Sequence, residues 1–327
     1  MVILSEAKDL LLYLKRAWLL LALAAPAAHA QWPEKPVRLV TPFSPGGGAD
    51  TLARLVTPSI SQALGQPIVV ENKPGAGTVI GVEYAAKAEP DGYTFLIAAN
   101  SMVINAALRK TRYDPVKDFA PVGMAASSAV VLAVHPSVPA RNATELIAYV
   151  RANPGKIAYG DCGTGSVMHL AGELMKLIAR IDMVRVTYKG CGPALTDALA
   201  GRIPVIFNTY GNTAPQAKAG KLRILGLASA TRSPVDASVP TIAEAGLSGI
   251  DADIWYAVFA PAGTPDAFVR RLNAEMRATL AKPDIDEKLR IQYFDVRPGT
   301  PEALARTVRD DLARWSKVVK DANIKID

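Results

Sequence analysis

A glycine-rich turn after the first apolar run has residue types that could bind an anion. The run Val37–Val40 stops at the sequence PFSPGGGAD, which occupies residues 42–50. Because glycine has no Cβ atom, Gly46, Gly47 and Gly48 can bring backbone N–H groups close to a ligand. The helix predicted over 49–64 adds the partial positive charge of its N-terminus. The residues alone leave two alternatives open, an anion site and a tight strand-to-helix connection without a ligand.

Polar residues and further glycines stand at the ends of other predicted strands. In the first half of the chain they are Ser44, residues 72–77, Asn100 and Ser101. In the second half they are residues 161–166, His169, residues 189–192, Asn208 and Thr209. Ligands of open α/β sheets bind beyond the carboxyl ends of the strands. We therefore expect these loops, and the helix N-termini that follow them, to converge on one cleft.

Motifs of enzymes and metal sites are missing from the sequence. No Gly-Lys-Ser/Thr closes a glycine loop, no Gly-x-Ser-x-Gly elbow occurs, and residues 75–81 lack features of a dinucleotide turn. His135 and His169 lie far apart without metal-ligand spacing, so we expect neither a metal nor a cofactor. Ser166 and His169 could form a nucleophile and base, but a polar helix start is favoured. Asp50 is predicted to orient the glycine turn or to cap its helix.

The elements that hold these loops alternate strand and helix, which predicts an α/β fold. Strands over 37–40, 67–71 and 93–99 with intervening helices predict a parallel sheet with covered faces. Two extended runs, 122–128 and 129–135, suit a crossover into a second unit of the same kind. The predicted elements of that unit are helices over 143–152, 167–181, 193–200 and one ending at 219, and strands over 156–160, 183–188, 204–207 and 222–228. A strand over 254–260 and amphipathic helices over 265–281 and 301–322 are expected to complete and cover the first unit.

This order predicts two lobes, each a mostly parallel sheet flanked by helices, with a ligand cleft between them. Lobe 1 would comprise 31–131 and 255–327, and lobe 2 would comprise 132–254. A chain of 327 residues, half of them hydrophobic, can bury cores of this size. The formal net charge is +7, but no run of five basic residues and no RNA-binding aromatic motif occurs, so nucleic acid is not an expected partner.

The first thirty residues have the pattern of an export signal. Lys15 and Arg16 precede an apolar run over 17–26, and Ala28-His29-Ala30 is a small-residue cleavage site. The apolar stretch is shorter than the roughly 20 residues of a membrane span, which disfavours an anchor. We expect cleavage after Ala30. Residues 1–14 are an atypical leader and indicate a misassigned translation start.

The two cysteines of the chain, Cys162 and Cys191, follow predicted neighbouring strands of the second unit. Adjacent parallel strands would bring their loops to the same rim, near disulfide-bonding range. Export makes oxidation possible. Two alternatives stay open, a disulfide that joins two ligand-facing loops and two free thiols in place of small residues.

Short segments, in the same order along the chain, resemble one known family. They are WPEKPV at 32–37, PFSPGGGAD at 42–50, VENKPGAG at 70–77, DGYT at 91–94, DPVKDFAPV at 114–122, HLAGEL at 169–174, YKG at 188–190, PTIAEAG at 240–246 and PAGTP at 261–265. Through these segments, residues 31–325 resemble the extracytoplasmic solute receptors of the tripartite tricarboxylate transporter family, which are also called Bug-type receptors.

The resemblance implies a two-lobed periplasmic binding protein of type II-like fold. Such a receptor closes on a small carboxylate and delivers it to a two-component membrane permease. The expected ligand is a di- or tricarboxylate or a related organic acid, and the expected protein is a monomer in the periplasm, without catalytic activity. The alternative is an exported α/β hydrolase acting on small esters or amides.

The resemblance also implies which residues bind the ligand, through backbone N–H groups, hydroxyls and ordered water. In lobe 1 they are Phe43, Ser44, Pro45, Gly46, Gly47, Asp50, Asn100 and Ser101. In lobe 2 they are Thr164, Gly165, Ser166, His169, Lys189, Gly190 and Asn208.

Three positions depart from the commoner pattern of the family. Asp161 and Cys191 stand where serine is usual, and Asn208 stands where an acidic residue is usual. A carboxylate at that last position would suit a ligand with an ammonium group. Asn208 therefore argues against an amino acid, an argument that the extra carboxylate of Asp161 partly offsets.

Overall fold

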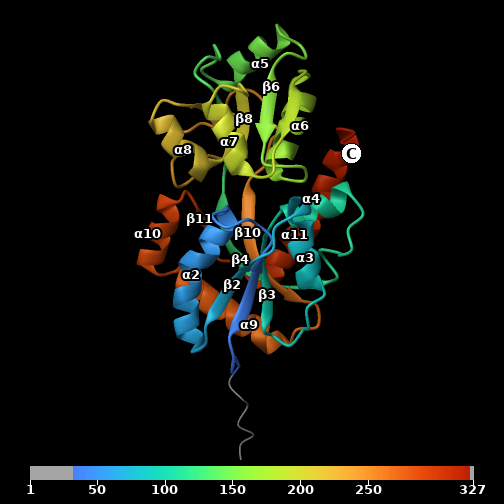
Figure 1. Ribbon diagram of the computed structural model, residues 1–327, viewed down its shortest axis with the longest axis vertical. Coiled ribbons are helices and arrows are strands. Elements are labelled where there is room, and N and C mark those ends of the chain that lie inside the picture. The colour runs from blue at the N-terminus through green and yellow to red at the C-terminus, as the bar shows by residue number, and fades with distance from the viewer. Residues whose placement is uncertain (1–31, 325–327) are drawn as a thin grey trace, which may run out of the picture. The chain divides into compact units, whose positions relative to one another are not determined.

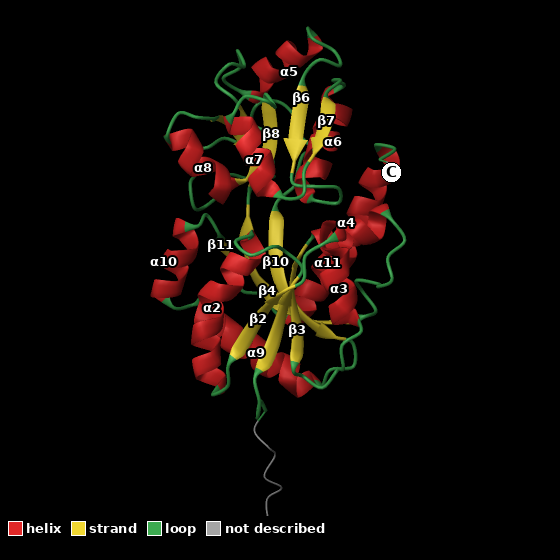
Figure 2. Cartoon of the chain, in the orientation of Figure 1, coloured by secondary structure: helices red, strands yellow, loops and turns green. Residues whose placement is uncertain are grey.

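Two β-sheets with helices packed against them make up the part of the chain that the structure, a computed structural model, describes (Figures 1 and 2). That part is residues 32–324, and its elements belong to one compact unit, Lys35–Asp327. The predicted signal peptide and its cleavage site lie outside the described residues. Within 32–324, no helix has both the length and the apolar character that crossing a bilayer requires.

The first sheet has the strand order β11-β4-β10-β3-β1-β2. Its strands are β1 (Val37–Thr41), β2 (Ile68–Asn72), β3 (Thr94–Ala99), β4 (Phe119–Ser128), β10 (Ile254–Pro261) and β11 (Asp295–Val296). Strands β1, β2 and β3 are parallel, as the strand–helix alternation predicted. Strand β10 runs antiparallel to both β3 and β4, and β11 runs antiparallel to β4.

The second sheet has the order β7-β6-β8-β5-β9. Its strands are β5 (Val130–Val134), β6 (Ala158–Asp161), β7 (Val184–Thr187), β8 (Val205–Thr209) and β9 (Arg223–Leu227). Strands β6, β7 and β8 are parallel, whereas β5 is antiparallel to β8 and β9.

Both sheets are therefore mixed but mostly parallel, as expected. In the first sheet β1, β2, β3 and β4 share one direction, and in the second β6, β7, β8 and β9 do. Strand β5 and strands β10 and β11 run the other way. The reason is the double crossing between the sheets. Strand β4 leads directly into β5, so the chain passes from the first sheet to the second at Ala129. It returns after Asp253 in β10, which lies beside β4 in the opposite direction. The predicted crossover between 122–128 and 129–135 is confirmed.

Helices of the first sheet cover the parallel strands and the returning strand. They are α2 (Gly48–Leu64), the 3₁₀ turn η1 (Ala76–Thr78), α3 (Val79–Ala86), α4 (Ser101–Leu108), α9 (Asp266–Leu280), α10 (Pro283–Ile291) and α11 (Pro301–Asp321). Helix α11 packs on α4 and β4, and α9 packs on β4 and α2. The prediction that the two long C-terminal helices cover the first unit is confirmed.

Spacing and end signals explain why these segments are helical. In α11, Leu304, Val308 and Trp315 recur on one face and are buried, and Leu304 and Val308 belong to the first core. Thr300 caps this helix by accepting a hydrogen bond from the backbone N–H of Ala303, and Pro301 occupies its first position.

Helices of the second sheet are α5 (Ala143–Arg151), α6 (Val167–Ala179), α7 (Cys191–Leu199) and α8 (Tyr210–Lys218). Three of them, α6, α7 and α8, follow β6, β7 and β8 directly, so their N-termini stand at the carboxyl ends of strands. The apolar cluster beneath α7 includes Ala194, Ala198, Ile203 and Ile206.

Candidate functional site

The glycine turn between β1 and α2 is held from inside by Asp50. The carboxylate of this buried residue accepts hydrogen bonds from the backbone N–H of Gly46 (2.9 Å), from Arg54 Nε (3.0 Å) and from Asn72 Nδ2 (2.8 Å). Burial alone would raise the pKa of Asp50, but the bonds from Arg54, Gly46 and Asn72 lower it below its ordinary value. The prediction that Asp50 orients the turn is confirmed, and its oxygens are occupied.

The backbone N–H groups of this turn that lack a hydrogen-bond partner among the described residues are not those of the first two glycines. Gly46 donates to Asp50, and Gly47 donates to the carbonyl of Ser44 (3.1 Å). Across the described residues no acceptor pairs with the N–H groups of Gly48, Ala49 and Asp50. They form the first turn of α2, where unpaired donors and the helix dipole favour an anion. The unpaired donors of this turn are thus at Gly48, Ala49 and Asp50, after the two glycines whose N–H groups are paired.

Gly48 also has a steric reason to be glycine. A Cβ atom at this position would overlap the hydroxyl of Tyr256 on β10. Tyr256 is buried, so its ring cannot easily move away. The hydroxyl therefore lies against Gly48, at the start of α2.

Asn100 and Ser101 stand where β3 ends and α4 begins. Both side chains are buried. Asn100 Nδ2 donates to the carbonyl of Asp253 (2.7 Å), and its Oδ1 is buried without a hydrogen-bond partner. Ser101 Oγ accepts from Thr78 Oγ1 (3.3 Å). An unpaired buried acceptor is unfavourable, and Oδ1 of Asn100 is such an acceptor at the end of β3.

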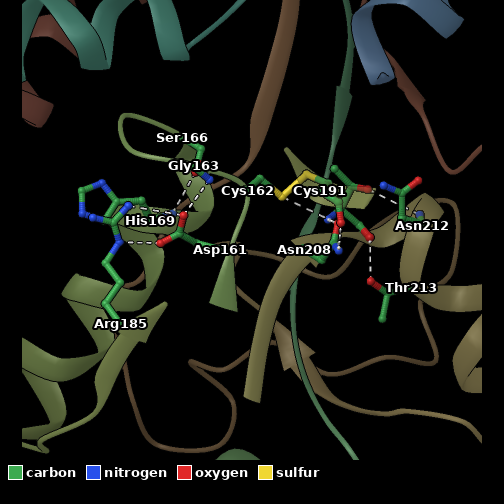
Figure 3. Close-up of a disulfide and its surroundings, with 11 residues drawn as sticks. Asp161, Cys162, Gly163, Ser166, His169, Arg185, Cys191, Asn208, Asn212 and Thr213 are labelled. Atoms are coloured by element: carbon green, nitrogen blue, oxygen red, sulfur yellow. Dashed lines mark hydrogen bonds and ion pairs between the residues drawn. A yellow bond between two sulfur atoms is a disulfide. The ribbon is translucent and has the colours of Figure 1, made fainter. Parts of the chain in front are cut away.

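The loop between β6 and α6 is organised by a buried ion pair (Figure 3). Asp161 is fully buried, and its Oδ2 lies 2.5 Å from Nε of Arg185 on β7. Its Oδ1 accepts from the backbone N–H of Gly163 (2.6 Å). Arg185 also donates to Thr164 Oγ1 (3.1 Å). The carboxylate of Asp161 is thus neutralised by Arg185, and the suggestion that it offsets the missing acid at position 208 is not supported.

Ser166 and His169 form a helix cap. Ser166 Oγ accepts from the backbone N–H of His169 (3.1 Å), while the Nδ1 atom of His169 accepts from Gly165 N–H (3.4 Å). The favoured interpretation, a polar helix start, is therefore confirmed. Burial, with the charges of Arg185, Lys176 and Arg109, lowers the pKa of His169 to about 3. The imidazole is neutral at physiological pH, with its remaining proton on Nε2.

Cys162 and Cys191 are joined by a disulfide, so the structure contains the first of the two alternatives (Figure 3). The bond ties the loop after β6 to the N-terminus of α7. Asn208 on β8 lies beside it. Its Nδ2 donates to the carbonyl of Cys191 (3.3 Å), and its Oδ1 accepts from the N–H of Thr209 (2.7 Å). Buried Asn208 therefore joins β8 to the disulfide by a hydrogen bond to the backbone of Cys191.

Lys189 and Gly190 precede α7. Gly190 has φ +121°, a conformation that side-chain-bearing residues rarely adopt, and open space faces its Cα. Lys189 is exposed. The backbone at Gly190 therefore leaves the N-terminus of α7 accessible.

Loops from the two sheets meet beside these residues. A Cβ atom on Gly77 would lie 2.6 Å from the carbonyl oxygen of Thr164. One on Gly165 would lie 2.5 Å from Oδ1 of Asn105. Glycine at 77 and 165 thus allows the first-sheet loop before α3 and helix α4 to touch the loop before α6. Thr164 and Gly165, two predicted site residues of the second sheet, are in this way brought against Gly77 and Asn105 of the first.

Sequence reasoning missed several polar residues of this region. They are Asn105 and Arg109 on and after α4, Arg185 on β7 and Tyr256 on β10. No motif contains them, because each reaches the site through the packing of an element. The neighbouring loop residues, in contrast, carry glycine and hydroxyl signals that the sequence shows directly.

The fold and the site define a solute-binding protein of the periplasmic type. The sequence model described as "Tripartite tricarboxylate transporter family receptor" matches residues 52–324. The chain belongs to this family. Bug proteins are among its relatives: Protein BugT of Bordetella pertussis is 33% identical over 307 residues, which cover 93% of this chain and 94% of BugT.

Solved structures of similar proteins have the same fold. The structure of Rpa4515 from R. palustris with adipate is 37% identical, with a TM-score of 0.85, and the match covers 90% of this chain and 99% of that one. MatC of Rhodopseudomonas palustris with bound malate is 34% identical, with a TM-score of 0.81, covering 88% and 100%. Both relatives are shown with a dicarboxylate.

Proposed function

We propose that this receptor captures a small organic acid, a di- or tricarboxylate or a related carboxylate, and delivers it to a two-component membrane permease of the tripartite tricarboxylate type. The observation that carries the proposal is the set of backbone N–H groups at Gly48, Ala49 and Asp50 for which no hydrogen-bond partner is found among the described residues. A carboxylate oxygen is a suitable acceptor for such donors, and the helix dipole adds favourable charge. The ligands of the two solved relatives support the same class.

The charges around the loops favour a ligand without an ammonium group. The carboxylates of Asp50 and Asp161 are each paired with an arginine, Arg54 and Arg185. Asn208 carries no charge and is hydrogen-bonded within the protein. A ligand ammonium would therefore gain no ion pair from these three residues. We propose that amino acids bind more weakly than organic acids of the same length.

The remaining site assignments belong to the same proposal. The two sheets would mark two lobes, with 31–131 and 255–327 in lobe 1 and 132–254 in lobe 2. The cleft between them would be lined by the loops of Phe43 to Gly47, Asn100 and Ser101 on one side. On the other side it would be lined by the loops of Thr164 to Ser166, Lys189 and Gly190. The receptor would work in the periplasm as a monomer after cleavage following Ala30.

Receptor function is proposed without catalysis. Ser166 is engaged as a helix cap, and the His169 ring accepts from a backbone N–H, so these two side chains do not form a nucleophile–base pair. Membership of a receptor family also favours binding over the exported hydrolase.

The ligand can be captured directly. Receptor purified from the native periplasm without dialysis would be denatured, and the released small molecules identified by mass spectrometry. We expect a carboxylate in near-stoichiometric amount. The same preparation, incubated with a panel of small esters and amides, should show no turnover. Recovery of a neutral sugar, or hydrolysis of any panel member, would contradict the proposal.

A further inference from the structure

Arg109, at the C-terminal end of α4, is a cation that has no ion-pair partner among residues 32–324. Its Nε is buried and makes no hydrogen bond. Within the described part of the chain, no carboxylate forms an ion pair with its guanidinium. A buried, unpaired N–H is unfavourable, because this donor has lost water without gaining an acceptor.

The other cations of this region are neutralised. Arg185, Lys176 and Arg109 all act electrostatically on His169. Arg185 is paired with Asp161, and Lys176 is paired with Glu173 at 3.1 Å. The imidazole is itself uncharged at neutral pH. Arg109 is therefore the member of this group whose positive charge is not balanced by a carboxylate.

Arg109 lies where the loops of the two sheets meet. The Cβ position of Gly77 is 3.8 Å from Nη2 of Arg109, 3.6 Å from Oδ1 of Asn105 and 2.6 Å from the carbonyl oxygen of Thr164. Asn105 is fully buried, and its Nδ2 donates to the carbonyls of Gly77 and Ser101, whereas its Oδ1 has no partner. The unpaired cation thus lies near Thr164, a residue of a proposed ligand loop, and near Asn105, which is hydrogen-bonded to the backbone of Ser101.

We infer that Arg109 binds the second carboxylate of the ligand and so selects dicarboxylates over monocarboxylates. The inference rests on the proposed function, in which the start of α2 holds the first carboxylate. The planar guanidinium offers parallel N–H donors that match a carboxylate, and such charge-assisted bonds are stronger than neutral ones.

The test compares ligands that differ only at one end. Calorimetric titrations would use linear four- to six-carbon dicarboxylates and their monoamides, in which one carboxylate is replaced by a neutral group of similar shape. Wild-type receptor should bind a dicarboxylate at least tenfold more tightly than its monoamide. Arg109→Gln should weaken the dicarboxylate tenfold or more and change the monoamide less than threefold. The control Lys110→Gln removes a positive charge from the exposed neighbouring position. It should leave the affinities for the dicarboxylate and for the monoamide unchanged.

Each other outcome overturns the inference. Equal losses for dicarboxylate and monoamide in Arg109→Gln would make Arg109 a contact between loops, and unchanged affinities would remove it from the site. If Arg109→Gln does not fold, Arg109→Lys decides by the same comparison, with a smaller loss expected only for the dicarboxylate. Wild-type binding of dicarboxylate and monoamide with equal affinity would contradict this inference alone. Wild-type receptor that binds no carboxylate would contradict the proposed function as well.

Discussion

Asp161 and Arg185 form an ion pair beneath the loop that precedes α6, with 0% and 20% of their side chains exposed. Asp161 accepts a hydrogen bond from the N–H of Gly163, and Arg185 donates one to the hydroxyl of Thr164. The pair therefore fixes the conformation of a proposed ligand loop. A buried ion pair of this kind fixes the positions of its neighbours more than it stabilises the fold, because the cost of desolvating the two charges offsets much of their attraction.

Breaking one side of this pair should be more costly than removing both sides. Arg185→Met leaves the Asp161 carboxylate buried and unpaired, and we expect it to lower the free energy of unfolding by about 3–5 kcal/mol. The double variant Asp161→Ser/Arg185→Met removes both charges and should lose less. Urea unfolding measures all three proteins. A double variant less stable than Arg185→Met would contradict this account of the pair.

The disulfide is expected to stabilise the second sheet by restricting the unfolded chain. Cys162 and Cys191 are separated by 29 positions, and closing a loop of this length contributes about 3–4 kcal/mol on the chain-entropy model. Replacing both cysteines by serine should lower the free energy of unfolding by that amount. Adding a reductant should destabilise the wild type and leave the serine variant unchanged.

The bond itself is checked by thiol titration. Denatured, unreduced receptor from the periplasm should show no free thiol and migrate as a monomer. Two free thiols per chain would show that the two cysteines are not joined.

His169 should make the fold less stable in mild acid. Burial holds its pKa at about 3 in the folded protein, against 6.5 ordinarily. Below pH 6.5 the unfolded chain binds a proton that the folded protein does not bind until about pH 3, so stability is lost as the pH falls through this window. Between pH 7 and pH 5 the loss from this residue is about 2 kcal/mol.

Substitution separates this contribution from other acid effects. His169→Gln should remove that part of the pH dependence, as measured by urea unfolding at pH 7 and pH 5. His135→Gln leaves His169 in place and should keep the wild-type slope. An unchanged slope in His169→Gln would show that the imidazole is protonated in the folded protein.

Gly77 is predicted to permit the close approach of loops from the two sheets. Alanine at this position would place a Cβ 2.6 Å from the Thr164 carbonyl, and we expect ligand affinity to fall at least tenfold because the loops must separate. Gly65 is a matched control, since its φ of +72° resembles the +66° of Gly77 but open space surrounds it. Gly65→Ala should cost about 1 kcal/mol of stability through backbone strain and leave affinity unchanged. Equal affinities in the two variants would refute this role.

Much of the fold could be predicted because strands and helices alternate, with glycine, proline and polar residues at their ends. The elements of 37–99 and 143–228 were found within a few residues of their observed bounds. Helix α4 was missed because its first five residues are all buried, which removes the polar face that marks a helix in sequence. Helix α10 has only two buried apolar residues, Ile285 and Leu289, and strand β11 exists only through its pairing with β4.

The site was predictable where chemistry and chain order coincide. Glycines and hydroxyl residues at strand ends indicated the loops, and the role of Asp50 followed from its place after the turn. The unpaired donors of the glycine turn could not be located from the sequence. The sequence cannot show that the N–H groups of Gly46 and Gly47 are hydrogen-bonded to Asp50 and Ser44. The pairing of Asp161 with Arg185 also required the register of β6 and β7, in which Tyr159 is opposite Arg185.

The most direct measurement compares carboxylates with their neutral amides on the wild-type receptor. A thermal-shift screen followed by calorimetry would use adipate, malate and other di- and tricarboxylates, each beside its fully amidated form and with neutral sugars as an unrelated class. Binding through the open donors at the start of α2 predicts that some carboxylate stabilises the protein and its amide does not. At one hundred times its dissociation constant, that ligand should add about 2.7 kcal/mol to the free energy of unfolding. Stabilisation by amides or sugars, with none by any organic acid, would contradict the account.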